Sequence, residues 1–337
     1  MAMGAVAMHG RWGWVAGVAL AVLLIGAGAA GLAARWTDAE PSTSLGRVVD
    51  NSGGVATQTS AQAATATNTP TPTPTPTPPP RSILAENQIV AYYGNPISPI
   101  MGILGEFDDP EELVRRLEAQ AARYQAVNRE KKVVPALHLV YAVAQEGAGR
   151  DGKYLYHMPD ETVEEYIDLT RKHNMLFFID LQNGRADPVE EAALVQKWMR
   201  HEHVHLVVDP EFTMAPGERP GVDLGAMDGE VVNRIQDLLQ QTAIEAKVSN
   251  KILVVHQFQY SMITNKDAIK DLDRVDVVIC LDGWGTPSVK REKWEAIAVG
   301  QKNEHISIKL FYRWDKPLLT EAEIEALTPR PHIIIYQ

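Results

Sequence analysis

Apolar runs and amphipathic stretches alternate along the chain from residue 88 onward. Eight runs are short, almost continuously apolar and rich in β-branched residues, which is typical of parallel strands covered on both faces. Between them lie seven stretches with the apolar spacing of helices that cover a sheet. The strands are predicted at 88–93, 133–141, 176–181, 204–208, 252–258, 275–281, 307–312 and 332–336, and the helices at 110–128, 160–174, 188–201, 228–249, 265–272, 288–299 and 320–327. Strands that alternate with helices indicate a parallel sheet.

Several predicted helices begin with a recognisable signal. Asp109 precedes Pro110, which is typical of a capped first turn, and Thr320 is followed by Glu323, which is typical of a capping box. Residues 82–337 match the ~250 residues typical of a (β/α)8 barrel, and eight strands over this length favour a closed barrel over an open sheet. The fold class is therefore predicted as α/β, a TIM-like (β/α)8 barrel. The last strand ends the sequence, so this barrel is expected to lack its last helix.

Two segments of different composition precede the predicted barrel. Residues 12–34 carry no charged side chain and are long enough to cross a bilayer, so residues 1–35 are predicted to be a membrane anchor, with a cleaved signal segment as the alternative. Residues 36–81 are rich in Ser, Thr, Ala and Pro and are predicted to be a disordered stalk. The barrel, residues 82–337, would then lie outside the cell membrane with the N-terminus in the cytoplasm, or be secreted after cleavage.

The net charge of the chain limits the classes of molecule that it is expected to bind. The formal net charge is −11, and acidic and basic residues cancel within residues 1–80, so the excess negative charge belongs to the predicted barrel. An acidic domain argues against nucleic acid as a partner. Cys280 is the one cysteine, which excludes an internal disulfide and a cysteine-based metal cluster. No cofactor is expected.

Polar and aromatic side chains follow the ends of most predicted strands. Because the carboxyl ends of all strands in a barrel meet at one face, where active sites form, these residues make up the predicted ligand site. A single histidine among them can equally be a packed core residue, and an aspartate before a glycine can cap a turn. The set is Tyr92, His138, Asp180, Gln182, Arg185, Asp209, Glu211, His256, Gln257, Asp282, Trp284, Lys309, Tyr312 and Asp315.

This mixture of carboxylates and aromatic rings suits a carbohydrate, because aromatic faces stack on sugar rings and glycoside hydrolysis uses two carboxyl groups. The ending Asp209-Pro210-Glu211 of the fourth strand resembles the D-x-E of chitinase-type glycosidases. The longer family pattern has aspartates where this chain has Val204 and Val207. The resemblance implies that Glu211 is the catalytic acid and that Asp209 is its partner.

The second catalytic carboxylate stays open among Asp180, Asp282 and Asp315, with Asp180 the first choice. A broader resemblance rests on the stretches AYYGNP, PALHLV, DLQNGRAD, DPEF, HQF, DGWG and KLFY with the closing strand. These resemble a group of exported bacterial barrel domains of glycosidase-like type. The resemblance implies the same fold and supports the same candidate site residues.

Three functions are therefore considered for the strand ends. The first is a barrel that binds and hydrolyses a glycan or cell-wall polymer with Glu211 as the acid. The second binds such a polymer without turnover. The third is a metal-dependent hydrolase that uses Asp180, Asp209, Glu211 and His256, an oxygen-rich set suited to Mg²⁺ or Ca²⁺.

The stretch from His201 to His205 matches HExxH, the motif of zinc metallopeptidases. That chemistry needs a helix, which places both histidines on one face. Here the match crosses from the end of a predicted helix into the start of a predicted strand. We therefore interpret it as a histidine-rich turn rather than a zinc site.

Overall fold

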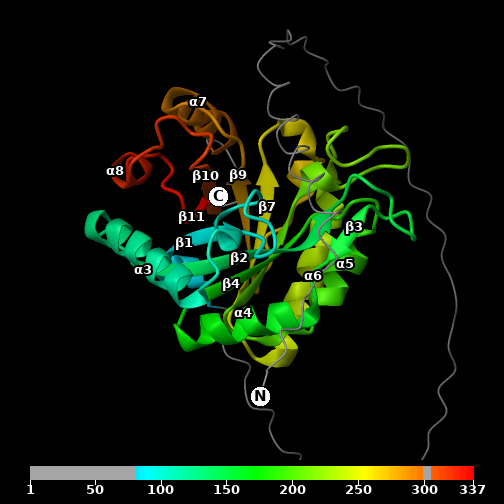
Figure 1. Ribbon diagram of the computed structural model, residues 1–337, viewed down its shortest axis with the longest axis horizontal. Coiled ribbons are helices and arrows are strands. Elements are labelled where there is room, and N and C mark those ends of the chain that lie inside the picture. The colour runs from blue at the N-terminus through cyan, green and yellow to red at the C-terminus, as the bar shows by residue number, and fades with distance from the viewer. Residues whose placement is uncertain (1–80, 299–304) are drawn as a thin grey trace, which may run out of the picture. The chain divides into compact units, whose positions relative to one another are not determined.

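The computed structural model describes residues 81–298 and 305–337, which form a closed parallel barrel of eight strands (Figure 1). Each strand pairs in parallel with the next, and the last pairs with the first. The predicted (β/α)8 fold class is thus confirmed for this part of the chain. The barrel strands are β1 (Asn87–Gly94), β2 (Lys132–Ala144), β4 (Leu176–Leu181), β5 (Val204–Val208), β7 (Lys251–Gln257), β9 (Val275–Leu281), β10 (His305–Leu310) and β11 (Ile333–Tyr336).

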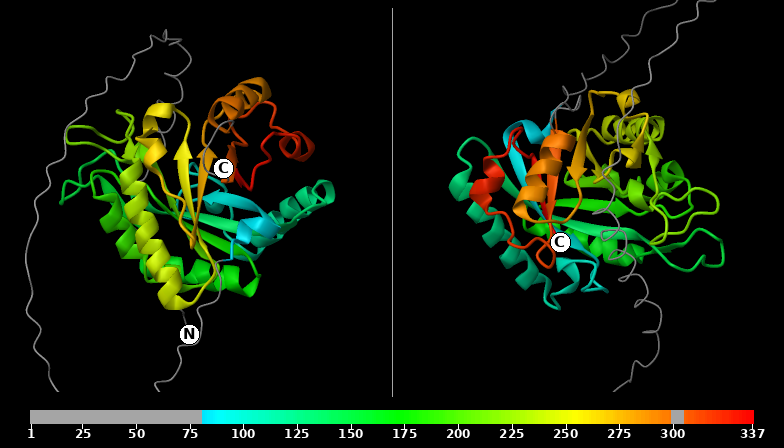
Figure 2. Two further views of the ribbon diagram at one scale, coloured as in Figure 1. Left: turned by 180° about the vertical axis from the view of Figure 1, so that it is seen from behind. Right: turned by 90° about the horizontal axis from the view of Figure 1, so that it is seen from above.

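The helices that connect the strands lie outside the ring of strands (Figure 2). Asp109 accepts a hydrogen bond from the backbone N–H of Glu111, and Thr320 and Glu323 form the capping box that the sequence predicts. Among the described residues no helix is both long and apolar enough to span a membrane, and the predicted anchor and stalk lie outside them. The helices are α3 (Pro110–Val127), α4 (Asp160–Lys172), α5 (Pro188–Val195), α6 (Gly229–Ala246), α7 (Pro287–Ala298) and α8 (Glu321–Glu325).

The helix predicted at 265–272 is wrong. This segment forms only the 3-10 turn η6 (Lys266–Ala268) and then runs irregularly to β9. Asn233 of α6 donates to the carbonyl of Ala268 at 2.8 Å and accepts from the N–H of Lys270 at 2.9 Å. The Asn233 side chain therefore pairs with backbone groups that would otherwise pair within a helix. A helix of eight residues also has little stability of its own.

Two small additions to the barrel were not predicted. The strand β3 (Leu155–His157) pairs antiparallel with the end of β2. The strand β6 (Met227–Asp228) pairs with β8 (Ile263–Thr264) in a separate two-stranded sheet. Both lie in connections that follow barrel strands, so they shape the end of the barrel where the candidate site is expected.

Successive side chains on each strand point alternately into the barrel and toward the helices. On β1, Ala91 and Tyr93 belong to the apolar core inside the barrel, whereas Val90 and Tyr92 belong to the core between strands and helices. Leu84 of the short helix α2 (Ile83–Glu86), which precedes β1, packs into the inner core at the amino end of the strands. The alternation decides which polar side chains can reach the interior.

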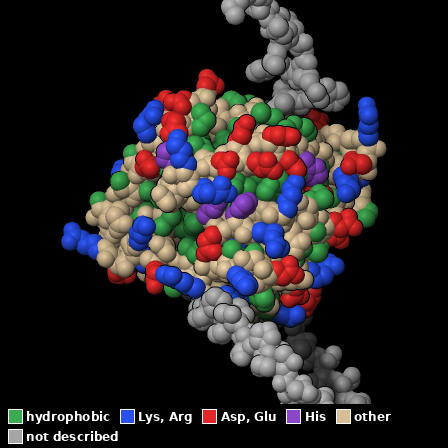
Figure 3. All heavy atoms as spheres, turned by 90° about the horizontal axis from the view of Figure 1, so that it is seen from below, with side chains coloured by type: hydrophobic (Ala, Val, Ile, Leu, Met, Phe, Trp, Pro, Cys, Tyr) green, Lys and Arg blue, Asp and Glu red, His purple; other side chains and the backbone are tan. Residues whose placement is uncertain are grey.

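The surface seen from below carries Lys and Arg side chains interspersed with Asp and Glu (Figure 3). This face shows no broad basic area of the kind that binds a phosphate backbone.

Candidate functional site

Six charged or imidazole side chains converge inside the barrel toward the carboxyl ends of its strands. They follow the inward positions of their strands, as Asp209 follows Val207 and His256 follows Val254. None is more than 5% exposed. We call this set the inner cluster: His138 on β2, Asp180 on β4, Asp209 directly after β5, His256 on β7, Asp282 directly after β9 and Lys309 on β10.

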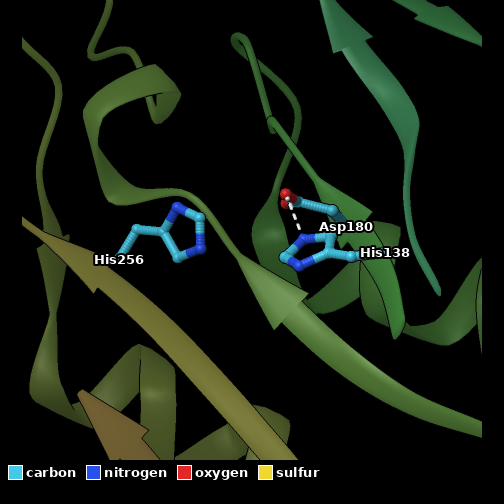
Figure 4. Close-up of side chains that lie close together, drawn as sticks. All are labelled: His138, Asp180 and His256. Carbon is cyan, nitrogen blue, oxygen red and sulfur yellow. Dashed lines mark hydrogen bonds and ion pairs between the residues drawn. The ribbon is translucent and has the colours of Figure 1, made fainter. Parts of the chain in front are cut away.

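Two imidazoles organise the inner cluster. His138 Nε2 lies 2.9 Å from Asp180 Oδ2 (Figure 4). His256 Nδ1 lies 2.8 Å from Asp282 Oδ2 and 3.6 Å from Asp209 Oδ1. The Lys309 ammonium donates to the same Asp282 oxygen at 3.0 Å. Asp282 is thus held between a lysine and a histidine, whereas Asp180 has a histidine alone.

Tyr93 packs against the inner cluster, whereas the sequence predicts its neighbour Tyr92 as a site residue. The Lys309 Nζ lies 3.8 Å from the centre of the Tyr93 ring, a cation–π contact, and the ring meets His138 edge-on with centroids 4.7 Å apart. The alternation along β1 was the signal that could have found it, since Ile89 and Ala91 share its face. Tyr92 necessarily points the other way.

Burial and ion pairing shift the pKa values of the inner cluster in opposite directions. Burial lowers the pKa of His138 to about 4, so its imidazole is neutral near pH 7. Burial raises the pKa of Asp209 to about 7. Burial would also raise the pKa of Asp282, but the charges of Lys309 and His256 outweigh it and hold that pKa below its ordinary value. Asp282 is therefore ionised while Asp209 is poised to hold a proton.

Several polar atoms of the inner cluster have no hydrogen-bond partner although they are buried. They are Asp180 Oδ1, Asp209 Oδ1 and both ring nitrogens of His256, whose Nδ1 stays close to Asp282 without good alignment. Buried polar atoms in proteins nearly always have a partner. A buried water molecule, an ion or a ligand group could satisfy these atoms.

Glu211 lies at the mouth of the barrel rather than at its deepest point. It belongs to the 3-10 turn η4 (Pro210–Phe212) that follows β5, and it is half-buried. The N–H of Gly225 donates to the Glu211 carbonyl at 2.9 Å and fixes the turn. Burial, with the charges of Asp209 and Asp282, raises the pKa of Glu211 well above its ordinary value.

Tyr92 and Tyr312 lie outside the barrel. Both pack against Tyr336, with ring centroids 6.3 Å and 5.1 Å away, and the Tyr312 hydroxyl donates to Gln120 of α3. They line a groove of about 710 Å³ along α3 with Phe107. The structure does not bring them together with the inner cluster.

The other predicted residues form contacts that hold the loops around the mouth of the barrel. Gln182 accepts from the N–H of Ala144, and Gln257 pairs with Lys266 at 2.5 Å. These contacts fix neighbouring chain segments and leave the two amides engaged.

Arg185 stacks on the Tyr154 ring and donates to a backbone carbonyl. Asp315 accepts from the N–H groups of Gly285 and Phe311 and lies 3.2 Å from Lys290 Nζ. Asp315 therefore has a structural role, because its buried carboxylate is paired within the protein.

Two tryptophans are exposed at the carboxyl end of the barrel. Trp284 follows β9 and Trp314 follows β10, and their ring centroids are 6.3 Å apart. They are 39% and 42% exposed. Exposed aromatic rings at a site of this kind offer a stacking surface to a ligand.

The HExxH match does not lie on a helix. The 3-10 turn η3 (Trp198–Arg200) ends before His201, and β5 begins at Val204. His205 points into the barrel near its amino end and accepts from the N–H of Ile252. The motif is therefore a turn and a strand start, as we interpret it from the sequence.

No protein-family model matches this sequence, and no curated protein matches it either. Among solved structures, one that is similar is XEG5A, a GH5 xyloglucan-specific endo-beta-1,4-glucanase from a metagenomic library in complex with cellotriose. The identity is 12% and the TM-score 0.42 over 71% of this chain and 80% of that chain. Another is XAIP-II, a xylanase and alpha-amylase inhibitor protein from Scadoxus multiflorus, with 9% identity and a TM-score of 0.38 over 74% of this chain and 92% of that chain. At these values neither likeness indicates what this chain does.

Proposed function

We propose that the barrel binds a glycan at the carboxyl end of its strands and hydrolyses it, with Glu211 as the proton donor. The observation that carries the proposal is the position of Glu211, half-buried at the mouth and directly beyond the buried Asp209. Burial and neighbouring negative charge favour its protonated form, which is the form that a general acid needs.

Glycoside hydrolysis also needs an ionised carboxylate. Asp282 fits this role better than Asp180 because at 5% exposed it is the less buried of the two, and Lys309 and His256 keep it ionised. A pair of carboxyl groups whose environments move their pKa values apart is the usual arrangement of an acid and its partner. Trp284 and Trp314 would hold the sugar rings by stacking.

Binding without turnover is the second candidate, and a specific observation favours it. Asp180, Asp209 and Asp282 are almost inaccessible, and each lies against a buried histidine. A polymer would reach Glu211 and the tryptophans first, and the loops would have to move before it reached an aspartate. Such a surface could recognise a cell-wall polymer without cleaving it.

The first test separates these two candidates. The full chain would be incubated with a panel of plant and cell-wall glycans, with release of reducing ends and affinity measured in parallel. Turnover that disappears in Glu211→Gln supports hydrolysis. Affinity without turnover supports the binding function.

We also propose that residues 1–35 anchor the protein and that the barrel lies outside the membrane. Protease treatment of intact cells should then release a fragment close to residues 82–337, which should melt cooperatively when purified. A protected barrel would contradict the proposed location.

A further inference from the structure

We infer that the inner cluster binds a divalent transition-metal ion, held by His138, Asp180 and His256. This goes beyond the proposed function, which places its chemistry at Glu211 on the mouth. The three ligands come from β2, β4 and β7, and Figure 4 shows the His256 ring turned toward the His138–Asp180 pair.

The spacing of these three side chains suits a single ion. One ligand atom from each lies within 4.8 Å of the others, and His138 Nε2 and Asp180 Oδ2 are 2.9 Å apart. Nitrogen and oxygen ligands lie about 2.0–2.2 Å from zinc in a tetrahedral arrangement, so two neighbours around one ion are separated by about 3.4 Å. Small side-chain movements would therefore bring all three onto one centre.

The polar atoms without partners lie on the same residues. Asp180 Oδ1 and His256 Nε2 are buried, with no hydrogen-bond partner. His256 Nδ1 lies 2.8 Å from Asp282 Oδ2, so a proton on Nδ1 faces a carboxylate and leaves the lone pair on Nε2. A carboxylate behind a metal-binding histidine is the usual device that fixes the tautomer and the ring orientation.

The formal charge of the inner cluster also calls for a cation. Asp180, Asp209 and Asp282 share one lysine ammonium, Lys309, in a buried space. Uncompensated buried charge is costly. One divalent ion would cancel it, and two retained protons are the competing explanation.

A second trio, Asp209, His256 and Asp282, has similar spacing. The Lys309 ammonium is bonded to Asp282 at 3.0 Å and would repel an ion placed there. The trio with His138 is therefore the better site.

Two imidazoles and a carboxylate select the kind of ion. Imidazole suits Zn²⁺, Fe²⁺, Co²⁺ and Ni²⁺, whereas Mg²⁺ and Ca²⁺ prefer oxygen alone. This differs from the oxygen-rich set that the sequence suggested, because His138 joins His256 and Glu211 stays at the mouth. Zn²⁺ is the ion to test first.

The test is a titration of the full chain with Zn²⁺ after chelator treatment, in which calorimetry measures the binding. Metal analysis of the dialysed protein then gives the amount of Zn²⁺ bound per chain. We expect about one Zn²⁺ per chain, little binding of Mg²⁺ or Ca²⁺, and at least a 100-fold loss of affinity in His256→Ala, because the loss of an outer-shell partner alone costs about 10–100-fold. The absorption spectrum of Co²⁺ in the wild-type chain reports nitrogen ligation without any variant, in case His256→Ala fails to fold.

The matched control is the double variant His201→Gln, His203→Gln. These two histidines have rings 6.1 Å apart near the amino end of the barrel and could bind zinc adventitiously. Loss of binding in this control, unchanged binding in folded His256→Ala, or no stoichiometric Zn²⁺ and no Co²⁺ spectrum would each overturn the inference. The readout needs no glycan, so its failure is distinct from failure of the proposed hydrolysis.

Discussion

Asp209 and Glu211 are two residues apart, yet they occupy different layers of the barrel end. Asp209 is 1% exposed and faces the interior, whereas Glu211 is half-buried at the mouth. The two-residue period of a strand would give both the same direction, but β5 ends at Val208 and Pro210 begins a 3-10 turn. The carboxyl groups therefore divide into one that lies against His256 and one on the turn beyond the end of the strand.

The turn that carries Glu211 should depend on Gly225. A methyl group added at this position would lie 2.5 Å from the Thr213 carbonyl oxygen and 2.8 Å from that of Glu211. We expect Gly225→Ala to lower the free energy of unfolding by about 1–3 kcal/mol, as overpacking does, and to weaken glycan binding. Chemical denaturation measures the first effect. Gly147→Ala, which meets nothing within 4 Å, is the control, and equal effects of both would contradict the prediction.

Lys309 should stabilise the inner cluster far more than an exposed lysine stabilises the surface. Its ammonium is buried against Asp282 and the Tyr93 ring. Lys309→Met leaves Asp282 with His256 alone, and we expect a loss of about 3 kcal/mol, the cost of breaking a buried ion pair. Lys172→Met breaks the exposed pair with Glu111 and should lower the stability far less, because exposed ion pairs contribute little. Similar losses in urea unfolding would show that the buried pair has no special role.

The barrel strands were predictable because parallel strands covered on both faces are continuous apolar runs. β4, β5 and β9 begin and end where the sequence predicts. The segment at 265–272 could not be assigned in this way, because its backbone partners are Asn233 and Gln236 of a helix distant in sequence.

The location of the candidate site was predictable, because the carboxyl ends of all strands in a barrel meet at one face. The two-residue period along β1 places Tyr93 on the inward face and Tyr92 on the outward face, so the sequence also carries the signal for Tyr93. The role of Asp315 could not be predicted, since its partners Gly285 and Lys290 belong to another loop and helix.

His332 should make the barrel sensitive to acid. Burial, and then the nearby charge of His305, lower the pKa of His332 to about 4 from an ordinary 6.5. The folded state therefore binds this proton less readily than the unfolded state. Its contribution to stability is present above pH 6.5 and decreases as the pH falls from 6.5 toward 4, by up to about 3 kcal/mol.

Unfolding free energies of the wild type and of His332→Gln across this range check the prediction. The substitution should flatten the pH dependence, because glutamine does not titrate. Parallel curves for the two proteins would show that another group is responsible.

Catalysis should be lost as the pH rises. Glu211 must be protonated to act as an acid, and its raised pKa keeps the activity to higher pH than an ordinary glutamic acid near 4.5 would. Lys309 opposes this shift, so Lys309→Met should move the alkaline limb of kcat/KM to higher pH. A limb that stays in place or moves to lower pH would argue against Glu211 as the group that titrates.

The most direct measurement compares glycan hydrolysis by the wild-type chain with Glu211→Gln and Glu218→Gln, both glutamates of the connection between β5 and α6. Circular dichroism confirms that each variant is folded. We predict that Glu211→Gln lowers the rate of reducing-end release by about 100-fold or more, as loss of a general acid does, and that Glu218→Gln retains it. A folded Glu211→Gln protein that cleaves as fast as the wild type would contradict the account, and so would a wild-type chain that cleaves no glycan in the panel.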